Sequence, residues 1–162
     1  MVISQPPGRI IRRLAPLASY ILPQYHKAVR NLTQQYYGIV ERITMSSRFV
    51  IQEHTTPEGV HWDLMLEDGD VLTTFRLEQP PQAALNRTVR AIRIFDHPLR
   101  FLTYEGPVQK GTGRVKIVNR GTCDLADEGE DVITLKLRST VLQGGFTLTR
   151  IEGASWQLVP KQ

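Results

Sequence analysis

The alternation of hydrophobic and polar residues changes character near residue 47 of this 162-residue chain. Between Gln24 and Arg42, apolar residues recur at intervals of three and four, as on one face of an amphipathic helix. Beyond residue 47, short runs rich in Val, Ile, Thr and Phe alternate with turn residues, and the period is close to two. The pattern therefore predicts a partly helical N-terminal extension over residues 1–46 and an all-β domain over residues 47–162.

The all-β domain is expected to consist of short strands joined by tight turns. Turn residues such as Asp68-Gly69 and Gly144-Gly145 recur at intervals of roughly 8 to 14 residues, a spacing typical of a β-sandwich or a closed barrel. The predicted strands cover residues 48–54, 60–67, 71–77, 88–95, 100–104, 114–119, 132–137, 145–151 and 156–159.

The net charge of +4 is concentrated in the N-terminal extension. Residues 1–46 hold six basic side chains and one acidic side chain, whereas the β domain carries a net charge of −1. Arg9, Arg12 and Arg13 are expected either to make nonspecific, salt-sensitive contacts with nucleic-acid phosphates or to form a solvated tail. Because Met45 stands immediately before the first strand, an alternative is that translation starts there and the extension is a mis-called start.

Composition narrows the class of protein and its location. With 41% hydrophobic and 22% charged residues, the chain is typical of a folded domain rather than a disordered one. Its most apolar segment, residues 14–22, is interrupted by Pro16 and is too short to cross a membrane. The single cysteine, Cys123, cannot form an intramolecular disulfide or a thiolate zinc site. We therefore expect a cytoplasmic protein without a membrane partner.

Two histidines flank the first predicted hairpin. If residues 56–59 form a type I turn, with Pro57 at its second position, His54 faces His61 across the ladder, with side chains about 5 Å apart. Asp63 emerges on the same face of the second strand as His61, about 6.7 Å further along. The spacing therefore predicts that His54, His61 and Asp63 converge.

Two imidazoles and one carboxylate suit a divalent transition ion such as Mn, Fe or Zn, with coordination positions left open for a substrate oxygen or water. Two alternatives remain open. The three residues are also typical of an exposed, solvated hairpin, and the same set describes the facial triad of iron-dependent oxygenases on β-barrels.

Five short motifs occur in one order along the β domain. They are FVIQEH at residues 49–54, HWDLMLE at 61–67, DHPL at 96–99, YEG at 104–106 and SWQL at 155–158. In these motifs the chain resembles the 3′-phosphoesterase domain of bacterial DNA ligase D. The resemblance covers about residues 48–159.

The resemblance implies a compact β-barrel with a polar cleft. It also implies a Mn²⁺-dependent enzyme that removes a 3′-terminal ribonucleoside, and then the 3′-phosphate, from a DNA primer during end repair and non-homologous end joining. His54, His61 and Asp63 match the family's metal ligands, and other divalent transition metals are possible. His97 matches the histidine placed against the phosphate, and His97 and His61 are the expected catalytic residues. DNA or RNA 3′ ends are the expected partners, together with a separately encoded ligase or repair polymerase.

Two departures from the family pattern affect phosphate binding. Met65 stands where the family has an arginine, and Phe101 stands where it has a tyrosine. Losing a preorganised donor costs on the order of 10² to 10³ in rate. Arg76 is the candidate replacement for phosphate binding, ahead of Arg48 and Arg100. Because of these departures, an alternative function is that of a non-catalytic module that binds metal or nucleic-acid ends.

Overall fold

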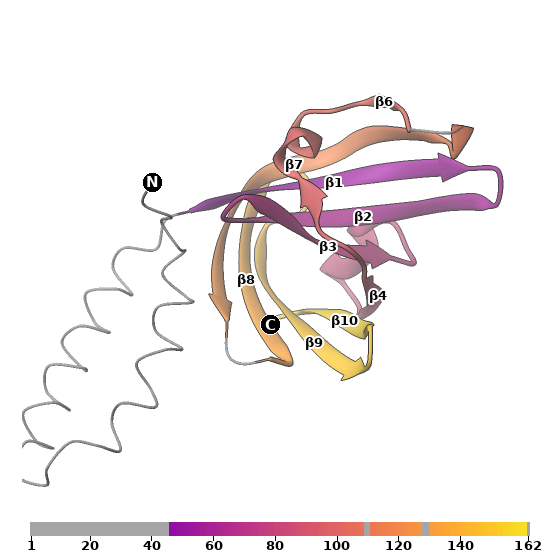
Figure 1. Ribbon diagram of the computed structural model, residues 1–162. Coiled ribbons are helices and arrows are strands. Elements are labelled where there is room, and N and C mark those ends of the chain that lie inside the picture. The colour runs from indigo at the N-terminus through magenta and orange to yellow at the C-terminus, as the bar shows by residue number, and fades with distance from the viewer. Residues whose placement is uncertain (1–45, 109–110, 128–129, 162) are drawn as a thin grey trace, which may run out of the picture. The chain divides into compact units, whose positions relative to one another are not determined.

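The computed structural model describes residues 46–108, 111–127 and 130–161 (Figure 1). The predicted helix and basic tail of the extension lie outside these residues, so both stay predictions. No helix in the described part of the chain is long and apolar enough to span a membrane. The elements are β1 (Ser47–Thr56), β2 (Gly59–Asp68), β3 (Val71–Leu77), η3 (Pro81–Leu85), β4 (Val89–Arg93), β5 (His97–Pro98), η4 (Leu99–Leu102), β6 (Gly106–Pro107), β7 (Arg114–Asp127), β8 (Val132–Ser139), β9 (Gly144–Glu152) and β10 (Ser155–Pro160), where η denotes a 3₁₀ helix.

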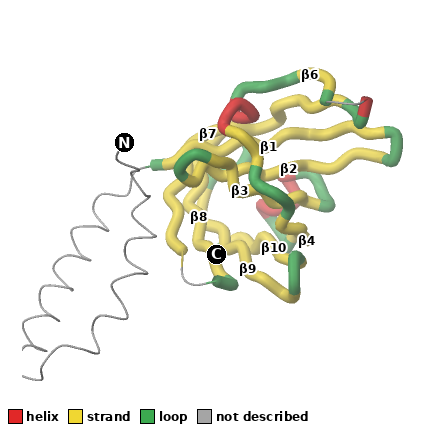
Figure 2. The backbone as a smooth tube through the Cα atoms, in the orientation of Figure 1, coloured by secondary structure: helices red, strands yellow, loops and turns green. Residues whose placement is uncertain are grey.

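The strands form one antiparallel sheet that closes on itself. Its order is β1-β2-β3-β4-β10-β9-β8-β7, and β7 pairs back onto β1, with Phe49 opposite Gly121. The short β6 adds to the other side of β7, and β5 pairs with the start of β3. Figure 2 shows the strands wrapped around a common interior. The predicted all-β closed barrel is therefore confirmed.

The period of two along β1 and β2 sorts their side chains onto two faces. Phe49, Ile51, Leu64 and Leu66 point inward and are at most 1% exposed. Inward-facing residues of the other strands complete this main core, among them Phe75, Leu135, Leu137, Phe146, Leu148, Trp156 and Leu158. The interior is thus filled by apolar side chains, as in other small barrels.

A second, smaller apolar cluster lies on the outer face of β1, β2 and β3. Its buried members are Val50, Met65, Leu72 and Leu102, with Leu99, Phe101 and Ile117 partly buried around them. Leu102 comes from η4, so the segment between β4 and β7 covers this part of the barrel wall. The outer face of the first three strands is therefore a packed surface rather than a fully solvated one.

The predicted strand over residues 100–104 is wrong, because Leu99–Leu102 forms the 3₁₀ helix η4. Pro98 precedes it in an extended conformation, and the amide of Thr103 donates to the carbonyl of Arg100 at 3.3 Å. In a 3₁₀ helix, residues three apart lie on the same side, so Leu99 and Leu102 both reach the outer cluster. Period-two alternation could not produce that contact.

The strand predicted over residues 114–119 runs further, to Asp127. A register shift in its pairing with β1 occurs between Ile51 and Gln52, where the partners change from Asn119 to Ile117. This bulge breaks the period-two pattern in the middle of the strand, which is why the pattern predicted an end there.

Gly121 pairs with Ser139 of β8 at a close approach of the two strands, so we predict that Gly121→Ala destabilises the barrel. An added Cβ would lie 2.1 Å from the carbonyl oxygen of Arg138, which is backbone and cannot move aside. Forcing extra volume into a packed region costs about 1–3 kcal/mol in the free energy of unfolding. Urea denaturation followed by circular dichroism measures the loss.

Gly145→Ala is the matched control. The nearest atom to a Cβ at Gly145 would be Cβ of Lys161, at 3.2 Å, a contact that a shift of a few tenths of an ångström relieves. Its free energy of unfolding should stay within about 0.5 kcal/mol of the original value. Equal stability of the two variants would contradict the close approach of β7 and β8.

Candidate metal centre

The β1–β2 hairpin positions the two histidines as the sequence predicts. Thr55 pairs with Val60, and His54 pairs with His61. Within the turn, the amide of Glu58 donates to the hydroxyl of Thr56 at 3.2 Å, which helps to fix the two-residue connection. The imidazole rings meet edge to face, with centroids 4.7 Å apart and an interplanar angle of 71°.

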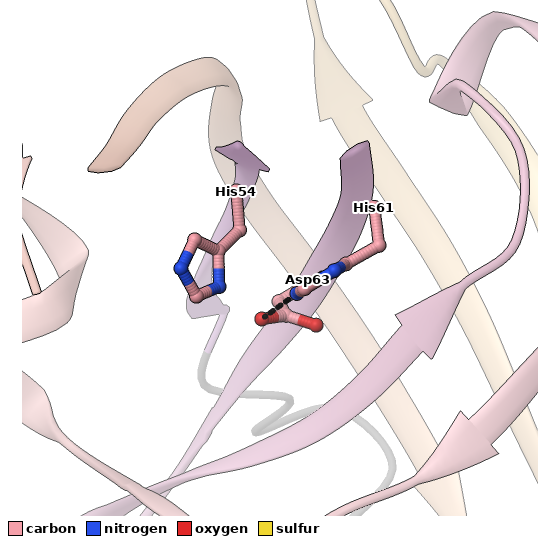
Figure 3. A group of neighbouring side chains, drawn as sticks. All are labelled: His54, His61 and Asp63. Carbon is pink, nitrogen blue, oxygen red and sulfur yellow. Dashed lines mark ion pairs between the residues drawn. The ribbon is translucent and has the colours of Figure 1, made fainter. Parts of the chain in front are cut away.

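Asp63 completes a cluster of three potential ligands on the outer face of the barrel. The ligand atoms of His54, His61 and Asp63 all lie within 4.8 Å of one another. Figure 3 shows the three side chains directed toward a common space. Asp63 is 4% exposed, whereas the two histidines are half-buried. The predicted convergence of the three residues is present in the structure.

One potential ligand atom of the cluster lacks a hydrogen-bond partner in the described part of the chain. The Nε2 atom of His61 is buried and has no hydrogen bond within the described part of the chain. It lies 3.6 Å from Oδ2 of Asp63, beyond hydrogen-bond distance. A buried nitrogen without a partner is uncommon in proteins, and a bound cation would satisfy it. Two imidazoles and one carboxylate therefore fit a divalent transition metal.

The protonation of His61 is suited to binding a cation. Burial lowers the pKa of His61, the negative charge of Asp63 opposes this shift, and the positive charge of Arg76 adds to it. The imidazole is therefore neutral near pH 7, and the neutral ring is the form that coordinates metals.

His54 is oriented by the loop that precedes β7. Its Nε2 atom lies 3.2 Å from the carbonyl oxygen of Thr112, and since a carbonyl only accepts, Nε2 carries the proton. The other ring nitrogen, Nδ1, faces Asp63 (Figure 3). A hydrogen bond of this kind fixes the tautomer of a metal-ligating histidine. Gly113 allows the loop to approach, because its φ is +120° and an added Cβ would lie 2.1 Å from the carbonyl of Thr55.

Arg76 reaches the cluster from β3. It stands opposite Asp63 in the ladder, and its Nε donates to Oδ1 of Asp63 at 3.1 Å. The side chain of Arg76 is 36% exposed, and within the described chain its terminal amino groups have no hydrogen-bond partner. Arg48 instead pairs with Glu67, and Arg100 lies over the ring of Phe101. Of the three arginines considered as replacements, Arg76 is the one in contact with the cluster.

His97 comes from β5 and is held by a residue that sequence reasoning missed. Its Nδ1 lies 2.9 Å from the hydroxyl of Thr74, and that hydroxyl donates to the carbonyl of Leu72. Nδ1 of His97 must therefore be the donor, which leaves the lone pair on Nε2. Burial lowers the pKa of His97, while the negative charge of Asp63 partly restores it, so the two groups interact across the site.

The two departures from the family pattern lie in the outer apolar cluster. Met65 is 1% exposed and pairs with Thr74 across the ladder. Phe101 packs at the edge of the cluster, in edge-to-face contact with His97 at 5.2 Å. The site therefore meets an apolar wall formed by Met65 and Phe101.

Gln52 is a second residue whose role the sequence did not reveal. It is fully buried, and its Nε2 donates to the carbonyls of Phe101 and Tyr104 at 2.9 and 2.8 Å. These bonds attach the end of η4 to β1. The available signal was an amide directly after the buried apolar run Phe49–Ile51 and two residues before His54.

Comparison with known proteins matches the chain to a known domain family. A family model described as the DNA ligase D 3′-phosphoesterase domain matches residues 52–150. The multifunctional non-homologous end joining protein LigD of Mycolicibacterium smegmatis is 29% identical over 127 residues, which are 68% of this chain and 16% of that protein. LigD of Mycobacterium bovis is 32% identical over 117 residues, 67% of this chain and 15% of that protein. The chain thus spans less than a fifth of the length of these curated relatives.

We predict that the cluster binds one divalent cation and that Asp63→Asn weakens binding by about 10-fold or more, because the substitution removes a charged ligand. Isothermal titration with Mn²⁺ measures the affinity. Asp68→Asn, at the exposed end of the same strand, is the control and should bind Mn²⁺ as the original chain does. Equal affinities of the two variants would assign the ion to another place.

Proposed function

The chain belongs to the DNA ligase D 3′-phosphoesterase domain family, and on this premise we propose that it is a metal-dependent phosphoesterase acting on the 3′ ends of nucleic acid. The reaction we propose is removal of a 3′-phosphate or a 3′-terminal ribonucleoside during DNA end repair. The observation that carries the proposal is the convergence of His54, His61 and Asp63, with Arg76 bound to the same carboxylate.

His54, His61 and Asp63 would hold the metal, which we propose to be Mn²⁺. Mixed nitrogen and oxygen donors with open positions suit this ion. A divalent ion bound there would supply Lewis-acid stabilisation of a phosphoryl oxygen and lower the pKa of a bound water. The protein's own contribution is to lower the pKa of His61 by burial and to orient His54 through its hydrogen bond with the carbonyl of Thr112.

Arg76 is the proposed phosphate-binding residue. Its Nε donates to Asp63, and its two terminal amino groups would be the donors offered to a phosphate bound beside the cluster. Guanidinium groups bind phosphate oxygens through paired donors and keep their charge at all relevant pH values. Arg76 would thus supply, from the neighbouring strand, the positive charge that Met65 does not provide.

His97 is the proposed residue against the transferred phosphate. Thr74 holds its Nδ1–H, so Nε2 is the atom available to the substrate. The negative charge of a bound phosphate would raise the pKa of His97 and favour protonation of Nε2. The protonated ring would then stabilise charge on a phosphoryl oxygen or donate its proton to a leaving oxygen.

A second candidate function is the binding of 3′ ends without turnover. The observation that favours it is the apolar surface formed by Met65 and Phe101, which replaces two hydrogen-bonding groups of the family pattern. The hydroxyl of Tyr104 does not fill the gap, because it donates to the carbonyl of Pro107. Such a module would deliver ends to a ligase or polymerase.

The primary test is incubation with Mn²⁺ and DNA primers that end in a 3′-phosphate or a single ribonucleotide. We expect release of the terminal group, abolished in His54→Ala and reduced by about 10²-fold or more in His97→Ala. Denaturing gels of 5′-labelled primers report the products, and circular dichroism confirms that the variants are folded. Binding of the primers without release would support the second candidate instead.

A separate prediction concerns Arg76. Because lysine keeps the charge but not the paired donors, Arg76→Lys should lower kcat by about 10²-fold at saturating Mn²⁺. Arg48→Lys is the matched control, since Arg48 pairs with Glu67 at the far end of the hairpin. An unchanged kcat in Arg76→Lys would remove this residue from the phosphate site.

A further inference from the structure

Phe95 is an exposed aromatic residue directly beside the proposed phosphate site. Its side chain is 73% exposed, the largest value among the exposed large hydrophobic residues of the described chain. Its ring stacks on the ring of His97, with centroids 4.7 Å apart and planes inclined by 27°. Exposure of this much apolar surface is unfavourable in water, so a binding partner that covers the ring would be stabilised.

The backbone around Phe95 is fixed to the barrel rather than left as a free loop. The amide of Ile94 donates to the carbonyl of Thr74 at 3.1 Å. The guanidinium of Arg93 binds that same carbonyl, the carbonyl of Ile94 and the carboxylate of Asp96. It also lies over the ring of Phe75, 5.4 Å from its centroid. Phe95 is therefore preorganised in its exposed position.

One face of the Phe95 ring is occupied and the other is open. His97 covers the first face and in turn contacts Phe101, whose ring contacts Tyr104 at 5.7 Å. Within the described residues, no second ring stacks on Phe95. The row of aromatic rings thus ends in a flat apolar surface next to the imidazole that faces the substrate phosphate.

We infer that Phe95 is a stacking platform for the base of the terminal nucleotide whose 3′-phosphate lies against His97. This inference rests on the proposed function and adds a substrate-binding residue to it. In a nucleotide, the base is joined to the 3′-phosphate through a single sugar, so adjacent protein groups contact both. Every base has a flat π face, so stacking accepts any terminal base and suits an enzyme that acts on ends of arbitrary sequence.

The first experiment measures KM and kcat on primers ending in a 3′-phosphate, with a normal or an abasic terminal nucleotide. Phe95→Ala should raise KM on the normal primer by about 5- to 150-fold, the range observed for loss of one base–aromatic stack, and leave kcat nearly unchanged. On the abasic primer, Phe95→Ala and the original chain should have the same KM, because this primer has no terminal base to stack. Phe95→Trp should behave as the original chain.

Ile151→Ala is the matched control, because Ile151 is 61% exposed and lies on β9, a strand that pairs with β8 and β10 and carries none of the proposed site residues. It should leave KM and kcat unchanged for both primers. An equal increase in KM of Phe95→Ala on normal and abasic primers would overturn the inference, and so would an unchanged KM on the normal primer.

The second experiment separates this inference from the proposed function. The probe is a 3′-phosphorylated primer whose terminal base is 2-aminopurine, preceded by an abasic site so that the protein is its only stacking partner. At saturation, its fluorescence should be quenched by the original chain and by Phe95→Trp but not by Phe95→Ala. Quenching without turnover supports the platform and contradicts the enzyme. Turnover without Phe95-dependent quenching, or no binding at all, contradicts the platform.

Discussion

The candidate centre depends on the register of one hairpin. A shift of a single residue between β1 and β2 would turn every side chain to the opposite face of the barrel wall. The register is held from within, because Ile51 and Leu64 are opposite each other and fully buried in the main core. Each inward residue therefore fixes the position of its outward neighbours, and His54, His61 and Asp63 meet because the apolar residues between them are locked in place.

The outer face of the wall combines two surfaces of opposite character. At the turn end of the hairpin it carries the charged cluster, and further along it carries the apolar cluster around Met65, covered by η4. Gln52 joins the two, since its amide holds the carbonyls at the end of η4 two residues before His54. His97 and Thr74 lie at the boundary, where burial lowers the pKa of the imidazole and Thr74 holds its Nδ1.

Local sequence patterns were enough to predict the β1–β2 hairpin. Contacts between strands that are distant in the chain could not be predicted from them. The turn predicted at residues 56–59 and the period of two were sufficient to place His54 opposite His61 and Asp63 beside them. Closure of the barrel depends on β1 pairing with β7, which are distant in the chain, so turn spacing alone left a sandwich and a barrel open. The same limit applies to Arg76, whose contact with Asp63 follows from the register of β2 with β3 and could not be derived from the sequence. The helix η4 was mistaken for a strand because its apolar spacing serves a contact outside the main core.

The position of the centre on the outer wall separates the residues that keep the barrel folded from those that face a substrate. The main core is inside the barrel, and the cluster and its cover share no side chain with it. Sequence change at the cover, such as methionine or phenylalanine in place of a polar group, alters the site without opening a cavity in the main core. The outer surface of such a barrel can therefore vary in sequence without loss of the interior packing that keeps the chain folded.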